Sequence, residues 1–188
     1  MSRLVTFGCS HTEGEGVENP LEHSWPAFLG KKLGMDVINL SIGGSSNRMI
    51  QHKVFNFDFE SDDKVIILWT YPDRYHFFSD QTTHTGDISH WHKTNISKFW
   101  YKYFHTPYNE KFDNQTIVHQ VNSYLDDLNM VHYNLVVHPD FNYYFNLYKR
   151  NFIDVDFPNF FKIYPIGLNH HLGVEGNKHY AQEIYTYL

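Results

Sequence analysis

Hydrophobic residues in this chain form short blocks that alternate with segments of helical spacing. The block from Lys64 to Thr70 is apolar on both faces, which is typical of a central strand in a parallel sheet. Similar blocks predict strands at residues 4–8, 36–40, 133–137 and 160–164. Helical spacing or capping residues predict helices at residues 24–33, 46–54, 114–129 and 176–188. Strands that alternate with helices indicate an α/β fold: a three-layer, flavodoxin-like α/β/α sandwich around a mostly parallel, five-stranded sheet.

Residues 72–113 do not follow this alternation. The segment is rich in Tyr, Phe, Trp and His and has little periodicity. A long irregular stretch inside a compact chain is usually functional, so we expect an aromatic insertion above the edge of the sheet that holds the active site. Neither a linker nor a repeat interrupts the rest, and residues 1–188 are expected to form one domain.

Composition and charge narrow the possible functions. The chain of 188 residues has a net charge of -6 and no cluster of Lys and Arg, which argues against nucleic acid or anionic membrane as a partner. Cys9 is the only cysteine, so no intramolecular disulfide is possible. Neither a signal-peptide-like stretch nor a membrane span is apparent, and we expect a cytoplasmic protein.

Two polar residues near the chain ends suggest nucleophilic catalysis. Ser10 follows the first predicted strand, and His171 precedes the last predicted helix. A serine beside a histidine is the arrangement that activates a hydroxyl nucleophile. Each residue also has a simpler explanation, because serine is common in turns and His171 is one of 14 histidines.

The order of motifs along the chain resembles that of the SGNH (GDSL-type) hydrolases. The matching residues are Gly8-x-Ser10 after the first strand, Asn39-x-Ser41-x-x-Gly44 after the second, and the loop with His171 before the last helix. The resemblance implies that Ser10 is the nucleophile and His171 the general base. It also implies that the backbone N–H groups of Ser10 and Gly44 form an oxyanion hole. More narrowly, residues 7–12, 44–47 and 69–74 resemble small SGNH-like proteins of tailed viruses that infect marine bacteria, so virion association is a further expectation.

The chain departs from the family pattern at three positions. Cys9 replaces the Asp that precedes the nucleophile, and Asn169 stands where the acid of the triad is expected. The side-chain oxygen of Asn169 is predicted to orient His171 instead, with Asp154 or Asp156 as a further hypothesis for a carboxylate partner. The third oxyanion donor, an Asn in the family, has no match, and Tyr71 is assigned to that place.

The substrate contacts are predicted from the loops at the same edge of the sheet. They comprise His11, Asn47, Thr70, Arg74, Trp91 and Trp100, although for Asn47 a role as a helix cap is favoured over substrate contact. Tryptophan stacks well on sugar faces, so the expected reaction is hydrolysis of an O-acyl ester, with O-acetyl carbohydrate as the expected substrate. The alternative is a catalytically inactive domain that binds glycan or a protein partner.

No cofactor or metal is expected. His84, Asp87, His90 and His92 lie close together in the insertion and include a His-x-His pair. Such a pair can bind zinc, but no further ligand pattern supports a metal site.

Overall fold

The protein is built on a sheet of four parallel strands. The computed structural model describes residues 2–79, 82–89, 93–138 and 151–188. The strands are β1 (Arg3–Phe7), β2 (Asp36–Asn39), β3 (Lys64–Trp69) and β6 (Val131–Val136). Their order in the sheet is β2-β1-β3-β6, and every neighbouring pair is parallel. This arrangement confirms the predicted α/β class.

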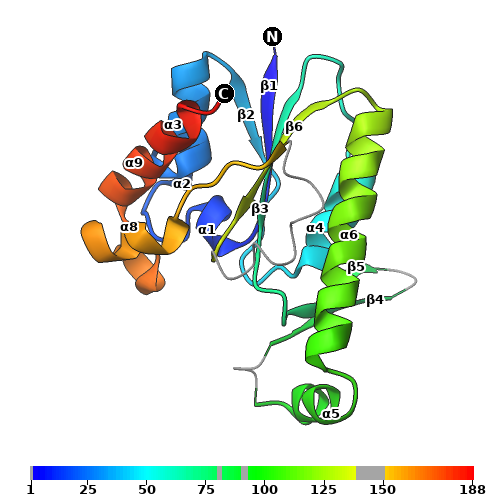
Figure 1. Ribbon diagram of the computed structural model, residues 1–188. Helices are drawn as coiled ribbons and strands as arrows, with labels where there is room; N and C mark the ends of the chain where they lie inside the picture. The colour runs from blue at the N-terminus through cyan, green and yellow to red at the C-terminus, as the bar shows by residue number, and fades with distance from the viewer. Residues whose placement is uncertain (1, 80–81, 90–92, 139–150) are drawn as a thin grey trace.

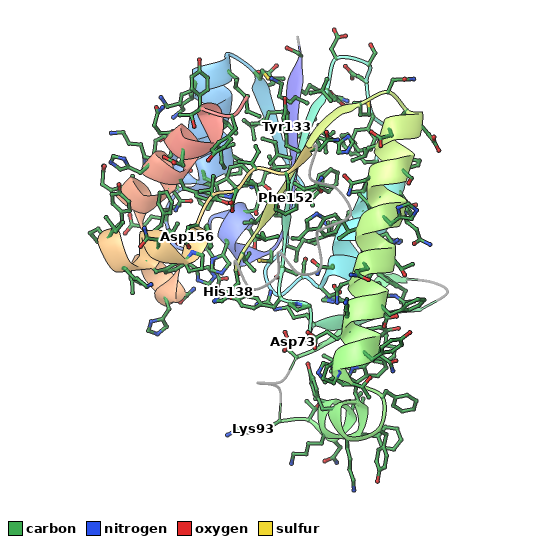
Figure 2. All side chains as sticks on the ribbon, in the orientation of Figure 1. Asp73, Lys93, Tyr133, His138, Phe152 and Asp156 are labelled. Carbon is green, nitrogen blue, oxygen red and sulfur yellow. The ribbon has the colours of Figure 1, made fainter. Side chains whose placement is uncertain are left out.

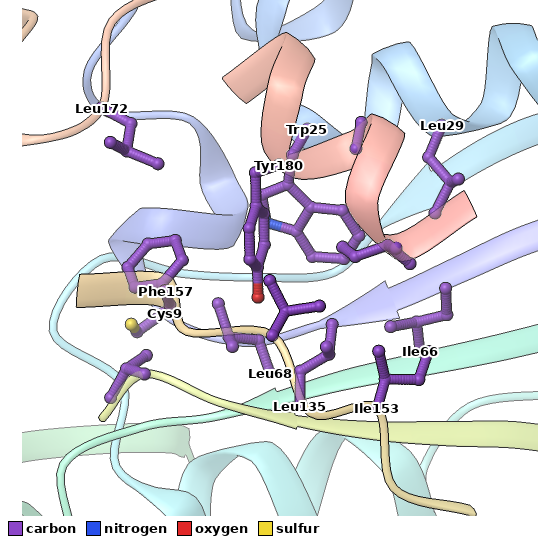
Figure 3. Close-up of a cluster of buried hydrophobic side chains, with 14 of the residues drawn as sticks. Cys9, Trp25, Leu29, Ile66, Leu68, Leu135, Ile153, Phe157, Leu172 and Tyr180 are labelled. Carbon is purple, nitrogen blue, oxygen red and sulfur yellow. The ribbon is translucent and has the colours of Figure 1, made fainter. Parts of the chain in front are cut away.

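Helices cover both faces of the sheet and complete three layers (Figure 1). One layer contains α3 (Trp25–Leu33), α8 (Phe157–Ile163) and α9 (Val174–Tyr185), and the other contains α4 (Asn47–Phe55) and α6 (Pro107–Asp127). Side chains alternate along each strand, so Leu4 packs toward the first layer and Val5 toward the second. In the first layer the ring of Trp25 meets Tyr180 edge to face at 5.8 Å (Figure 3). The apolar side chains on each face of the sheet form one buried cluster with the helices of that layer. Burial of these two clusters holds the helices against the sheet.

Capping residues fix the ends of two helices, at positions that agree with the predicted ranges 46–54 and 24–33. Ser46 precedes α4, and its hydroxyl oxygen accepts a hydrogen bond from the Met49 N–H at 3.3 Å. Gly34 ends α3 in the left-handed region, with φ of 66°. Ser46 thus defines the connection from β2 to α4 at the carboxyl edge of the sheet, and Gly34 defines the connection from α3 to β2 at the opposite edge.

The predicted fifth strand at residues 160–164 is wrong. Those residues belong to α8, which begins after Asp156 with Pro158 in its first turn. Phe157, Phe160, Phe161 and Tyr164 follow the i, i+3, i+4, i+7 spacing of a helix. On the edge of β6 that faces away from β3, the described residues form only one isolated parallel bridge, between Asn134 and Phe152.

The segment 72–113 is not irregular, in contrast to the prediction. It holds an antiparallel hairpin of β4 (Tyr75–Ser79) and β5 (Thr82–Ile88), then α5 (Asn95–Tyr103) and the first residues of α6. The hairpin and α5 extend past the carboxyl edge of the sheet, as expected for an insertion on that side (Figure 1).

Three short helical turns complete the described elements: α1 (Ser10–Glu13), α2 (Pro20–His23) and the 3-10 helix η3 (Leu168–His170). Two of them, α1 and η3, bring the beginning and the end of the chain together beside the sheet. Among the described residues, no helix has the length and apolar character needed to cross a membrane.

Candidate active site

Ser10 and His171 form a hydrogen-bonded pair. The Nε2 atom of His171 lies 2.8 Å from the Ser10 Oγ, although 161 positions separate the residues in the chain. Ser10 is the first residue of α1 and is only 5% exposed. The fold therefore places the predicted nucleophile and the predicted base within proton-transfer distance.

The main chain of Asn169, and not its side chain, orients the imidazole. The Nδ1 of His171 is 2.7 Å from the carbonyl oxygen of Asn169. A carbonyl oxygen can only accept, so Nδ1 carries the proton and Nε2 faces Ser10 as a free base. The predicted role of the Asn169 amide oxygen is thus corrected. The residue adopts the left-handed conformation, with φ of 49°, which turns its side chain elsewhere.

The Asn169 side chain is bound to Glu15 on the opposite loop. Its Nδ2 donates to the Glu15 Oε1 at 3.1 Å, and the Glu15 Oε2 lies 3.6 Å from the Nε2 of His171. Sequence reasoning assigned no role to Glu15. The signal that could have identified it is its position five residues after Ser10, directly beyond the turn that ends α1.

Neither Asp154 nor Asp156 supplies the missing carboxylate. Asp156 caps α8, where its Oδ1 accepts from the Asn159 N–H at 3.3 Å. Figure 2 shows Asp156 on the side of the molecule that carries α8. In the described part of the chain, the only acidic side chain in ion-pair contact with His171 is that of Glu15.

His11 packs beside the catalytic pair as a neutral ring. Its ring centroid lies 4.6 Å from that of His171 and 5.0 Å from that of Phe157. Burial, and after it the nearby His171 and Arg74, lowers the pKa of His11 to about 3. The Nδ1 of His11 is buried and has no hydrogen-bond partner in the described structure. The ring of His11 therefore packs against His171, and its predicted contact with substrate stays a prediction.

The loop after β2 carries the glycines of the second motif. Gly44 adopts φ of 75° inside a turn in which the Ser45 N–H donates to the Ile42 carbonyl at 3.2 Å. A β-carbon on Gly43 would lie 3.8 Å from the Cβ of Ser10, so this loop borders the nucleophile. The Gly43 N–H itself donates to the Glu13 Oε2 at 2.6 Å.

Asn39 ties this loop to α1. Its Nδ2 donates to the carbonyl of Thr12 at 2.8 Å, and its Oδ1 accepts from the Ser41 N–H at 3.2 Å. The asparagine of the second motif therefore fixes the distance between the nucleophile helix and the glycine loop.

Asn47 clamps the loop after β3, in place of the predicted contact with substrate. Its Oδ1 accepts from the Thr70 N–H at 2.8 Å, and its Nδ2 donates to the Thr70 carbonyl at 3.1 Å and to the Asn114 Oδ1 at 2.7 Å. Asn47 is only 3% exposed. Both ends of the amide are engaged inside the protein, so the side chain cannot contact a ligand without losing these bonds.

Arg74 and Thr70 lie between the glycine loop and the hairpin. The Nη1 of Arg74 donates to the Ser45 carbonyl at 3.3 Å and to the Thr70 Oγ1 at 3.1 Å. The guanidinium sits 4.8 Å above the ring of Tyr71. Tyr71 is half-buried against the core, and burial raises the pKa of its hydroxyl. The assignment of Tyr71 as an oxyanion donor stays a prediction.

Trp100 lies in a different place from the catalytic pair. Its ring packs between Tyr75, at 4.2 Å, and Phe104, at 5.6 Å. It lines a cavity of about 500 Å³ between α4, α5, α6 and the hairpin, and neither Ser10 nor His171 lines this cavity. The predicted role of Trp100 as a sugar platform in the site with Ser10 and His171 is thus corrected, because the tryptophan lines this separate cavity.

Trp91, a predicted substrate contact, lies outside the described residues, as do His90 and His92, two members of the histidine cluster in the insertion. The side chains of His84 and Asp87 in β5 are likewise not described. Among the side chains that the structure describes, no group of three or more His, Cys, Asp or Glu is arranged to hold a metal ion.

Comparison with solved structures places this geometry in a known fold. A lipolytic protein of the G-D-S-L family from Desulfitobacterium hafniense DCB-2 is 15% identical, with a TM-score of 0.61 and 99% of each chain covered. An acetyl xylan esterase, AlAXEase, is 14% identical, with a TM-score of 0.62 and 100% of each chain covered. The fold is that of the SGNH hydrolases.

A third SGNH-type neighbour is the acetyl xylan esterase Est2A from the rumen bacterium Butyrivibrio proteoclasticus. It is 14% identical, with a TM-score of 0.65, over 100% of this chain and 63% of that enzyme. No family model and no curated protein matches the sequence. At these identities the likeness concerns the SGNH fold, and the chemistry is argued from the residues themselves.

Proposed function

We propose that this protein is a serine esterase that hydrolyses O-acyl esters through an acyl-enzyme. The observation that carries the proposal is the 2.8 Å contact between the Ser10 Oγ and the His171 Nε2. The carbonyl of Asn169 fixes the tautomer that this reaction needs, because it takes the Nδ1 proton at 2.7 Å.

Acylation follows from this geometry. His171 removes the proton of the Ser10 hydroxyl while the Oγ attacks the ester carbonyl carbon, which gives a tetrahedral intermediate with a negatively charged oxygen. The intermediate collapses as the bond to the alcohol oxygen breaks, and the imidazolium protonates the leaving alcohol. Water then attacks the acyl-Ser10 with His171 again as the base, and the acid and the free serine are released.

Two backbone N–H groups support an oxyanion hole. The Ser10 N–H and the Gly44 N–H donate to no acceptor in the described part of the chain. The N–H of the preceding residue, Gly43, donates to the Glu13 carboxylate. The N–H of Gly44, which follows in the turn, is left available for a ligand. Donors that are free in the resting protein are those that can stabilise a developing oxyanion without first breaking a bond.

The substrate we propose is a small acyl ester of a carbohydrate, with acetyl as the acyl group. The support is the fold shared with two acetyl xylan esterases. In this chain the half-buried Arg74 lies beside the glycine loop, held there by the buried Thr70 hydroxyl and the Ser45 carbonyl, and its guanidinium can donate hydrogen bonds to sugar hydroxyls.

The alternative is an inactive domain that binds a glycan or a protein partner. One observation favours it: the Nδ1 of His171 meets a neutral carbonyl oxygen and not the carboxylate of a triad. Loss of that charge weakens the base, and replacing the triad Asp by Asn in a serine protease costs about ten-thousand-fold.

One experiment separates the two functions. The protein is incubated with p-nitrophenyl acetate and, separately, with a fluorophosphonate probe that labels activated serines. We expect turnover and labelling at Ser10, both lost in Ser10→Ala. Ser61→Ala, which changes an exposed loop serine, serves as the matched control. A folded wild-type protein that shows neither turnover nor labelling would support the binding domain.

A further inference from the structure

Glu15 occupies an unusual position relative to the catalytic pair. In a triad the acid meets the Nδ1 edge of the imidazole, but here that edge is bound by the Asn169 carbonyl. The carboxylate of Glu15 approaches the opposite edge, with its Oε2 at 3.6 Å from the Nε2. The nearest negative charge is therefore on the same side of the ring as the Ser10 hydroxyl.

The carboxylate is held in this position by its second oxygen. The Oε1 of Glu15 accepts from the Asn169 Nδ2 at 3.1 Å, and Asn169 is two residues from His171. The loops that carry Glu15 and His171 also dock directly, because the Leu168 N–H donates to the Gly16 carbonyl at 3.0 Å. The charge is thus fixed relative to the imidazole, although 39% of the Glu15 side chain is exposed.

Two other ionisable groups, His11 and Glu13, lie near the pair of Ser10 and His171, but neither is in ion-pair contact with the imidazole among the described residues. His11 packs against His171, and burial lowers the pKa of His11 to about 3, so it is neutral at neutral pH. The carboxylate of Glu13 is engaged by the Gly43 N–H. Within the described residues, Glu15 alone forms an acidic contact with His171.

We infer that Glu15 is a positioning residue that acts through His171: its carboxylate supplies the negative charge facing the imidazolium that forms during acyl transfer. The inference rests on the proposed esterase function. A charge that stabilises the transition state more than the bound substrate raises kcat and leaves KM unchanged. Glu15 thereby takes over, from the Nε2 side, the electrostatic part of the role that a triad acid has at Nδ1.

Glu15→Gln tests the charge without removing the tether. The amide oxygen of glutamine can still accept from Asn169, so the loop contact and the midpoint of thermal unfolding are expected to stay unchanged. We expect kcat for p-nitrophenyl acetate to fall about tenfold or more, with KM unchanged. Glu18→Gln, an exposed residue of the same loop, removes an equal charge away from His171 and is the matched control.

The outcomes separate this inference from the proposed function. If wild-type protein turns over the ester and Glu15→Gln retains its kcat within about twofold, the inference is overturned while the esterase stands. A fall in kcat that Glu18→Gln reproduces also overturns it, because the effect is then one of net charge. If wild-type protein has no activity and no labelled Ser10, the proposed function itself fails.

Discussion

A β-carbon placed on Gly16 would lie 2.2 Å from the carbonyl oxygen of Leu172, so these two residues pack main chain against main chain. Gly16 follows the nucleophile helix, and Leu172 follows His171 directly. The same β-carbon would lie 2.8 Å from the Cβ of His171. The loop after α1 is thus the surface against which His171 is positioned.

Gly16→Ala should therefore displace His171 from Ser10. Contacts this short cannot be accommodated without movement of one loop, and a displacement of about 1 Å at a reacting group can cost about a hundredfold in rate. We expect kcat/KM for p-nitrophenyl acetate to fall by about that factor. Gly34→Ala is the control: it introduces strain at φ of 66° but meets no atom within 4 Å. A Gly16→Ala protein with wild-type activity would show that the loops do not set the position of the base.

Asn169→Gly distinguishes a main-chain from a side-chain role. Glycine keeps the carbonyl that accepts from His171 and adopts the left-handed conformation without strain, and only the amide side chain is lost. We expect kcat/KM to decrease less than about tenfold, in contrast to the roughly ten-thousand-fold loss known for a triad whose acid is replaced. Steady-state kinetics on the variant measure this. A loss of kcat/KM near ten-thousand-fold would instead show that the Asn169 side chain orients His171.

The sequence was sufficient to predict the three layers and the proximity of Ser10 and His171, and the physical reasons are local. Strands such as Lys64–Trp69 are apolar on both faces, and Ser46 and Gly34 mark helix ends through their own backbone and side-chain chemistry. The carboxyl ends of parallel strands meet at one edge, which is why a serine after β1 could be placed there.

The surroundings of the pair could not be predicted, because they depend on contacts between distant loops. The left-handed conformation of Asn169 turns its carbonyl to His171 and its amide to Glu15, 154 residues away. From the sequence, Asn47 is predicted to cap a helix or contact substrate, and only the fold shows that it binds the main chain of Thr70. The aromatic residues of α8 were predicted to form a strand, because a short apolar stretch does not distinguish the helical repeat of about 3.6 residues from the strand repeat of about two.

Asn47→Ala should lower the stability of the fold and not simply the affinity for substrate. The change leaves the buried N–H and carbonyl of Thr70 without their partner. We expect the free energy of unfolding to fall by roughly 2–3 kcal/mol, measured by urea denaturation. Gln51→Ala, which removes an exposed hydrogen bond to Gln120 from the same helix, should change it by less than about 0.5 kcal/mol. Unchanged stability together with a raised KM would instead place Asn47 in contact with substrate.

The neutral, largely desolvated ring of His11 should make the free energy of unfolding depend on pH in the acid range. Its pKa is about 3 in the folded protein, lowered chiefly by burial, against 6.5 for the free side chain. Between these values the unfolded chain binds a proton that the folded protein excludes. Because of His11, the free energy of unfolding is therefore at its full value above pH 6.5 and decreases as the pH falls toward 3, by up to about 1.4 kcal/mol per pH unit.

His11→Phe tests this dependence, because phenylalanine retains the ring contacts with Phe157 and Phe161 and cannot bind a proton. Urea denaturation across the acid range should give the variant a flatter profile of unfolding free energy against pH than the wild type. His179→Gln, which changes a histidine whose side chain is 48% exposed on α9, should leave the profile unaltered. Equal slopes for His11→Phe and wild type would mean that His11 takes up its proton in the folded state as readily as in the unfolded chain. The ring beside His171 would then carry a positive charge at mildly acidic pH and oppose formation of the imidazolium on which acyl transfer depends.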